Sequence, residues 1–264
     1  MILFKTKEDI ELIREGGKIL ASVLEQVSEM AKPGITTGDL EELACRLIAE
    51  AGGRPAFKGY QTAVDDSPFP TALCTSINDE VVHGSALPPR TLKDGDIIGI
   101  DVGMEYPFKK GEKGLYTDMA RTVIIGEVDE SVKKLVRITK ECLNLAIDQV
   151  KPGNFLSDIG RAVQTHAEKN GFSVVRDLVG HGVGYEVHED PQIPNYEIKD
   201  NSLDNFELKP GMVIAIEPMI NMGKHRVQMK HGDWAIRTAD KSLSAHFEHT
   251  IAVTDDGHRV LTNL

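Results

Sequence analysis

Two apolar, β-branched runs that each carry one aspartate constrain this chain more than any other feature. The first run, residues 97–102, contains Asp101, and the second, residues 117–125, contains Asp118. Such runs are typical of buried or half-buried strands. The connection at 106–114 contains a proline and two glycines and is rich in lysine, which predicts a long hairpin loop.

Pairing of these two strands would place two carboxylates side by side in an apolar sheet. A buried carboxylate is costly unless a positive group holds it. Two of them repel, so one takes up a proton unless a cation lies between them. A metal site is one explanation; one surface aspartate and one turn aspartate is the other, and the hairpin alone leaves both open.

Composition limits the classes of function. The 264 residues suffice for one large α/β domain or two small ones. The net charge of −11 argues against broad nucleic-acid binding. No apolar run approaches the length of about 18 residues that a membrane span needs, and the start lacks the apolar core of a signal peptide. Three distant cysteines predict no disulfide framework, so we expect a cytoplasmic protein.

Apolar spacing and stop signals predict the order of the elements. Helices are expected at 6–32, 37–52, 131–150 and 157–170, the first opened by a capping box of Thr6 with Asp9. Strands are expected at 73–77, 81–82, 172–179, 212–216, 234–238 and 247–254, together with the hairpin. A proline-bearing loop is expected after residue 184.

The chain also contains a weak internal repeat. The stretch from Lys32 returns at Lys151, 119 residues further on, and the stretch from Leu92 returns at Leu208, 116 residues further on. We therefore predict one domain over 1–264, built from two similar halves of about 1–128 and 129–264. Ordinary helix-stop and turn chemistry is the alternative. In this alignment of the two halves Asp101 corresponds to Glu217, and Asp118 corresponds less closely to Glu248.

Four acids in apolar strands and one histidine between glycines form a candidate metal centre. They are Asp101, Asp118, Glu217, Glu248 and His181. Such a mixed oxygen and nitrogen set suits two divalent ions of the Co, Mn, Fe or Zn kind that share bridging carboxylates. Two such ions can activate a water molecule, which predicts hydrolysis.

At this point the sequence resembles methionine aminopeptidase type I, a pita-bread metallopeptidase family. The motifs that carry the resemblance are IDVG at 100–103, TDMART at 117–122, GHGVG at 180–184, HEDPQIPNY at 188–196, KPGMVIAIEPM at 209–219 and SAHFEHTIAVT at 244–254. The resemblance implies an α/β (α+β) pita-bread fold, in which two pseudo-symmetric halves combine antiparallel sheet with flanking helices. It also implies removal of the initiator methionine from nascent proteins with a small second residue.

The resemblance assigns roles to single residues. It implies metal ligation by Asp101, Asp118, His181, Glu217 and Glu248, with Asp118 and Glu248 bridging, acid/base catalysis by Glu217, polarisation of the scissile carbonyl by His188, and contact of His83 with the scissile amide nitrogen. Without it, each of those last two histidines is more often structural. From alternation about Glu248 we expect His246 and His249 to face away from the site.

A methionine pocket is implied at Tyr60, Phe69, Cys74 and Trp234. Sulfur packs well against aromatic rings, although Trp234 as ordinary core is the alternative. The resemblance further implies a monovalent cation near Asn78 and Ser244. Residues 61–70 and 104–116 are longer than we expect for the family.

The expected partners are the N-termini of nascent polypeptides. The ribosome is a further candidate, through Lys109, Lys110 and Lys113 or through Lys224, Arg226 and Lys230, against the alternative that these side chains are simply solvated. We expect no membrane, no specific nucleic acid and a monomer. The competing functions are a prolidase or aminopeptidase P, which usually carries an additional N-terminal domain, and a binding protein that has lost catalysis.

Overall fold

Four helices form close to the predicted positions. The computed structural model describes residues 2–62, 67–198, 202 and 204–264. The helices are α1 (Lys7–Met30), α2 (Thr37–Glu50), α3 (Glu130–Ile147) and α4 (Leu156–Lys169). The Thr6 hydroxyl accepts the Asp9 N–H and the Asp9 carboxylate accepts the Thr6 N–H, so the predicted capping box is confirmed.

The strands form four small sheets. They are β1 (Arg54–Pro55), β2 (Leu73–Ile77), β3 (Glu80–Val82), β4 (Ile97–Tyr106), β5 (Leu115–Ile124), β6 (Ser173–Val174), β7 (Gly180–Gly182), β8 (Glu189–Ile193), β9 (Val213–Ile216), β10 (Met219–Asn221), β11 (Val227–Met229), β12 (Ile236–Thr238), β13 (Ser244–His246), β14 (His249–Thr254) and β15 (Gly257–Val260). The sheet orders are β1-β4-β2 with β5 on β4, β13-β10-β6, β11-β12-β3 and β15-β14-β9-β7-β8. The described pairs are antiparallel.

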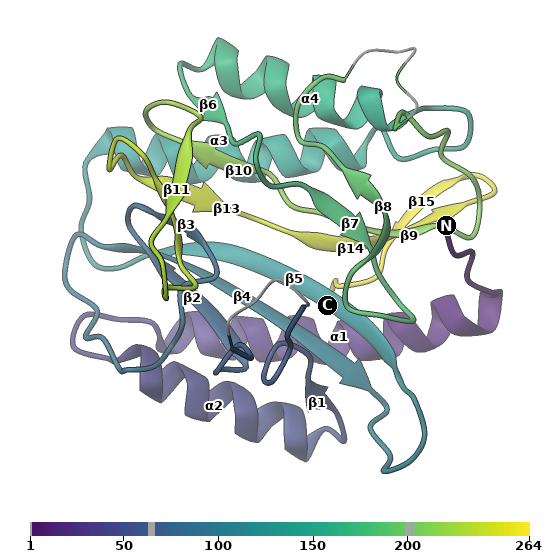
Figure 1. Ribbon diagram of the computed structural model, residues 1–264, viewed down its shortest axis with the longest axis horizontal. Helices are drawn as coiled ribbons and strands as arrows, with labels where there is room; N and C mark the ends of the chain where they lie inside the picture. The colour runs from purple at the N-terminus through teal and green to yellow at the C-terminus, as the bar shows by residue number, and fades with distance from the viewer. Residues whose placement is uncertain (1, 63–66, 199–201, 203) are drawn as a thin grey trace.

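The helices cover the strands from two opposite sides (Figure 1). One apolar core lies between α1, α2 and the β4–β5 hairpin, and contains Leu20, Leu40 and Ile100. A second core lies between α3, α4 and the strands of the C-terminal half, and contains Leu143, Ile159 and Ile216. The predicted class, antiparallel sheet with flanking helices, is confirmed.

The predicted hairpin is the longest strand pair described. β4 and β5 pair without a break from Ile97 opposite Ile124 to Tyr106 opposite Leu115. Asp118 lies opposite Gly103, two positions from Asp101, so the two aspartates are diagonal neighbours on one face. The hairpin therefore brings them together.

β5 meets the start of β14 at a seam between the two helix layers. At its centre Ala120 and Glu248 exchange backbone hydrogen bonds of 2.9 and 3.4 Å. On either side a threonine hydroxyl replaces the direct backbone bonds, because it accepts an N–H and donates to the C=O of the same residue. The pairs are Thr122 with His246 and Thr250 with Asp118, at 2.7–3.0 Å. The duplication into two halves stays a prediction.

Two strand predictions were wrong in extent, and one predicted loop contains a strand. Of 172–179 only β6 is strand, and β7 follows separately. The expected proline-bearing loop contains β8, whose Pro191 is accommodated because β8 is an edge strand. The run 247–254 begins as a strand only at His249, and β13 precedes it.

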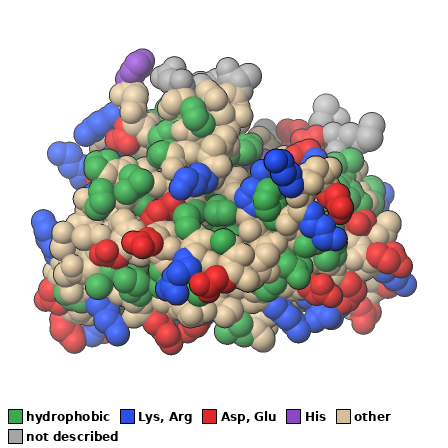
Figure 2. Space-filling model, turned by 90° about the horizontal axis from the view of Figure 1, so that it is seen from below, with side chains coloured by type: hydrophobic (Ala, Val, Ile, Leu, Met, Phe, Trp, Pro, Cys, Tyr) green, Lys and Arg blue, Asp and Glu red, His purple; other side chains and the backbone are tan. Residues whose placement is uncertain are grey.

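The outer surface carries charges of both signs. Figure 2 shows acidic and basic side chains interspersed with apolar ones over the face seen from below. Within the described residues, none of the helices combines the length and the apolar character required to traverse a bilayer.

Candidate active site

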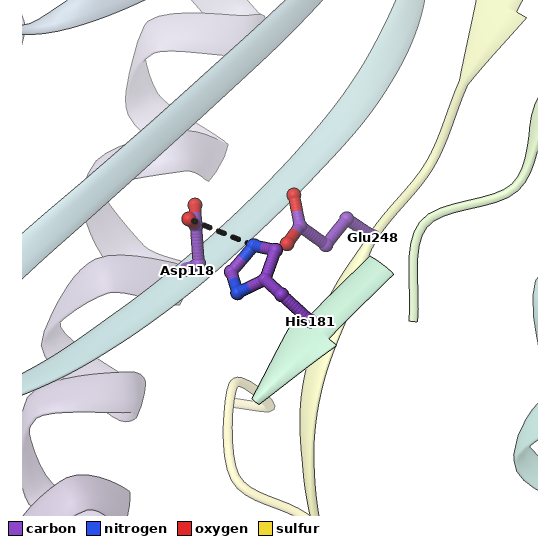
Figure 3. A group of neighbouring side chains, drawn as sticks. All are labelled: Asp118, His181 and Glu248. Atoms are coloured by element: carbon purple, nitrogen blue, oxygen red, sulfur yellow. Dashed lines mark ion pairs between the residues drawn. The ribbon is translucent and has the colours of Figure 1, made fainter. Parts of the chain in front are cut away.

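Three side chains that could ligate a metal ion come together from β5, β7 and the residue before β14 (Figure 3). Asp118 comes from β5, His181 from the glycine-flanked β7, and Glu248 directly precedes β14. One ligand atom from each lies within 4.8 Å of the others. His181 Nε2 lies 4.0 Å from Asp118 Oδ2.

A second group shares Glu248 with the first. It consists of Glu217, His246 and Glu248, again with ligand atoms within 4.8 Å of one another. Glu217 follows β9; its Oε1 lies 3.6 Å from His181 Nε2, and its Oε2 lies 3.4 Å from His246 Nε2. The prediction that His246 faces away was therefore wrong. Positions 246 and 248 are two apart, and such residues share a face.

Asp101 lies outside both groups but lines the same cavity. Buried carboxylate oxygens of Asp101, Asp118 and Glu248 have no hydrogen-bond partner among the described residues. Unpaired buried carboxylate oxygens are costly unless a cation satisfies them. The donor set is hard and anionic with one or two imidazoles, so it fits divalent transition-metal ions.

Burial and mutual repulsion shift the protonation of these acids. Burial, with a smaller effect of the Glu217 charge, raises the pKa of Asp101 to about 7, against the opposing effect of His246. Burial and neighbouring carboxylates also raise the pKa values of Asp118 and Glu248 well above their ordinary range. Without a cation, the cluster therefore holds protons at neutral pH.

The ring of His181 is oriented by its own strand. Its Nδ1 lies 2.9 Å from the carbonyl oxygen of Gly182. Because a carbonyl only accepts, Nδ1 carries the proton and Nε2 presents its lone pair to the carboxylates. This is the tautomer that a metal ligand requires.

Two further predicted histidines line the cavity. His188 Nδ1 lies 2.8 Å from the Tyr60 hydroxyl, and its ring is 4.5 Å from that of His181 between centroids. Desolvation lowers the pKa of His188 to about 3. Positive charge on the neighbouring His181 and His83 is a smaller cause of the same shift. His83 follows β3 with a left-handed φ of 61°, which turns the chain at the cavity wall.

Above the carboxylates the cavity is apolar. Its volume is about 490 Å³, and every residue predicted for the site lines it. The predicted pocket residues Tyr60, Phe69, Cys74 and Trp234 belong to one apolar cluster. The Phe69 and Trp234 rings meet edge to face, 5.4 Å between centroids. Cys74 on β2 lies opposite Asp101, so the pocket adjoins the acids.

Sequence reasoning missed Phe57 as a pocket residue. Its ring packs against β4 at Gly103, where a Cβ atom would approach Phe57 to 2.7 Å. The glycine in IDVG was the available signal, because a glycine inside a strand often marks a close approach.

The segment that carries His188 is tied to the N-terminal segment. Lys5 forms an ion pair with Glu189, and both side chains are almost fully buried. Glu189 Oε1 also accepts the N–H groups of Tyr185 and Glu186, at 2.6 and 2.9 Å. The buried ion pair thus supports the loop before His188.

The remaining predictions concern a monovalent cation, the lysines of the hairpin loop and the loop at 61–70. Asn78 accepts the Ser244 N–H at its carbonyl, 2.9 Å, so the two residues are adjacent; a cation there stays a prediction. Lys113 pairs with Glu186, and Lys109 lies 3.8 Å from Glu112. Of the long 61–70 loop, residues 63–66 lie outside the described residues.

Known proteins with similar sequences are metallopeptidases. Residues 11–255 match the model of metallopeptidase family M24. Methionine aminopeptidase 1 of Bacillus subtilis is 43% identical over 265 residues, with 100% of both chains covered. Methionine aminopeptidase of Escherichia coli K12 is 41% identical over 263 residues, which cover 99% of this chain and 94% of the relative.

Solved structures of metallopeptidases also match the fold of this chain. Methionine aminopeptidase of Thermotoga maritima matches with a TM-score of 0.91 and 44% identity, with 100% of both chains covered. The prolidase of Pyrococcus horikoshii shares the pita-bread fold, with a TM-score of 0.74 and 22% identity over 100% of this chain and 64% of the prolidase. The chain is therefore a hydrolase that belongs to metallopeptidase family M24.

Proposed function

We propose that this chain removes the initiator methionine from nascent proteins whose second residue is small. The observation that carries the proposal is a hard, acidic donor set directly beneath an apolar, aromatic-lined cavity. The relatives named methionine aminopeptidase, which match this chain from end to end, support it.

Asp101, Asp118, His181, Glu217 and Glu248 are the residues that would hold two divalent ions of Co, Mn, Fe or Zn. Once bound, such ions supply Lewis acidity and lower the pKa of water. The unpaired oxygens of the buried acids support this assignment. Bridging by Asp118 and Glu248 is part of the proposal.

The chain's own residues handle protons and orientation. Glu217 takes a proton from the water that attacks the scissile carbonyl carbon. Because the pKa of His188 is low, its ring is neutral at neutral pH. The Tyr60 hydroxyl can donate to its Nδ1, which leaves Nε2–H to donate to the carbonyl oxygen as negative charge develops there. As the C–N bond breaks, the leaving amine takes up the proton, and His83 contacts its nitrogen.

Substrate choice follows from the cavity walls. The methionine side chain would lie among Tyr60, Phe69, Cys74 and Trp234, where its sulfur contacts aromatic rings. The second side chain would meet the crowded wall of the metal site, which favours small residues.

The proposal also covers the binding partners of the chain and its compartment. The substrates are N-termini of nascent polypeptides, the compartment is the cytoplasm, and the chain acts as a monomer. A monovalent cation near Asn78 and Ser244, and contact of the two lysine-rich clusters with the ribosome, are further parts. Unchanged co-sedimentation with ribosomes after charge reversal of both clusters would refute the last part.

The test compares four tripeptides: Met-Ala-Ser, Leu-Ala-Ser, Met-Leu-Ser and Ala-Pro-Ser. The metal-free protein is reconstituted separately with Mn, Fe, Co and Zn. Glu217→Gln removes the proton acceptor, and Glu207→Gln, an exposed glutamate, is the matched control.

We expect cleavage of Met-Ala-Ser alone, lost in Glu217→Gln and kept in Glu207→Gln. Cleavage of Ala-Pro-Ser would assign the chain to the proline-specific relatives instead. Absence of cleavage with every metal, despite bound metal by elemental analysis, would favour a binding protein.

A further inference from the structure

His246 is a buried imidazole to which the reaction outlined above gives no role. Its side chain is 3% exposed, and its Nε2 has no hydrogen-bond partner in the described part of the chain. That nitrogen lies 3.4 Å from Glu217 Oε2 and 4.0 Å from Glu248 Oε2. An unpaired polar atom aimed at two carboxylates calls for an explanation.

The backbone of His246 is fixed so that the ring points to the site. Its N–H donates to Thr122 Oγ1 and its carbonyl accepts from the same hydroxyl, both at 2.9 Å. On the other side, His246 pairs with Met219, two residues after Glu217. The orientation of His246 is therefore set by both halves of the seam.

We propose that His246 is a positioning residue that holds the Glu217 carboxylate by donating a hydrogen bond from Nε2; the inference rests on the function proposed above. Nε2 is the ring nitrogen that faces the Glu217 carboxylate, and because a carboxylate only accepts, the contact requires the tautomer with hydrogen on Nε2. Such contacts are often long in the absence of bound groups and shorten once the site is filled.

The opposite end of the same carboxylate faces a different kind of nitrogen. Glu217 Oε1 lies 3.6 Å from Nε2 of His181, which presents a lone pair because its Nδ1 donates to Gly182. Glu217 thus lies between one imidazole suited to metal ligation and one suited to donation. A donor on Oε2 fixes the rotation of the carboxylate, so Oε1 stays directed at the metal positions and the attacking water.

Three substitutions of His246 separate donation from other roles. In Gln the amide nitrogen is as many bonds from Cα as Nε2 is in His, so His246→Gln keeps a donor in place. His246→Asn is one bond too short, and His246→Leu has no donor. His249→Leu is the matched control, because this neighbouring half-buried histidine bonds to Thr262 instead, 2.9 Å.

Cobalt(II) binding to the metal-free protein, measured by calorimetry and visible absorption without substrate, is the primary readout. We expect Asn and Leu at 246 to weaken cobalt affinity about 10- to 100-fold, the range typical of residues that orient metal ligands. The Gln variant should bind within about threefold of wild type, with the absorption bands of bound cobalt unchanged. Turnover of Met-Ala-Ser should follow the same order through kcat, with KM little changed.

Two results would overturn the inference. Unchanged cobalt affinity in the Leu variant would mean that His246 only fills space. If the Gln variant bound as poorly as the Leu variant and shifted the cobalt bands, His246 would be a direct ligand. Circular dichroism of each variant excludes loss of folding. Because the cobalt readout needs no peptide, failure of the proposed function would appear separately, as binding without cleavage.

Discussion

Replacement of Asp101 by asparagine should stabilise the metal-free protein at neutral pH. The raised pKa of Asp101 means that the folded protein keeps a proton that the unfolded chain has already lost. Wild type therefore loses stability as the pH rises from about 4, near the unfolded value, to about 7, the folded value. Asparagine has nearly the same shape and carries no charge, so it avoids this loss.

The magnitude follows from the size of the shift. The pKa rises from 3.8 to about 7, and each unit corresponds to about 1.4 kcal/mol, which gives an upper value of about 4 kcal/mol. The advantage of Asp101→Asn should be complete near pH 7.5 and fall to about 2 kcal/mol or less at pH 5.

Urea unfolding followed by circular dichroism in the presence of EDTA, from pH 5 to 8.5, measures this difference. Asp177→Asn, at an exposed aspartate, is the control and should change stability little at any pH. An Asp101→Asn variant that is less stable than wild type at pH 8, or a difference that does not depend on pH, would refute the reasoning. With saturating cobalt the order should reverse, because the variant has lost a proposed ligand.

Three further substitutions test the supports of the site. Lys5→Met should lower the free energy of unfolding by about 3 kcal/mol, because it leaves Glu189 buried without its partner. Urea titrations of Lys5→Met, Glu189→Gln and the double variant should show that the two effects on stability are not additive. Tyr60→Phe should lower kcat about 2- to 10-fold by removing the hydrogen bond to His188, which steady-state kinetics with an unchanged metal content would establish. Thr250→Val should cost about 2 kcal/mol of stability by urea unfolding, because two buried backbone groups lose their partner; an unchanged midpoint would contradict that role.

Local signals made the helices and the hairpin predictable. Capping residues, helix-stop Lys-Pro-Gly segments and β-branched runs act over a few residues, and the structure follows them at Thr6 and along β4 and β5. β8 was missed because proline argues against a strand unless the strand lies at an edge, and edge position is a property of the sheet.

The candidate site was predictable in its residue types and less so in its arrangement. The four acids stood out because charge in an apolar strand needs a reason. The prediction for His246 was wrong although the sequence held the signal, because residues two apart, such as 246 and 248, share a face of an extended chain. Phe57 was missed because its contact with Gly103 joins residues 46 positions apart.

The threonine seam has a consequence for how such a centre can be assembled. Thr122 serves His246 as Thr250 serves Asp118, so each half of the contact presents the same chemistry to the other, as the subunits of a symmetric dimer do. Across this contact Asp118 and His246 occupy equivalent positions, so one side presents a carboxylate where the other presents an imidazole. In the predicted duplication both halves are encoded in one gene, so each can change alone, and an imidazole can appear on one side only.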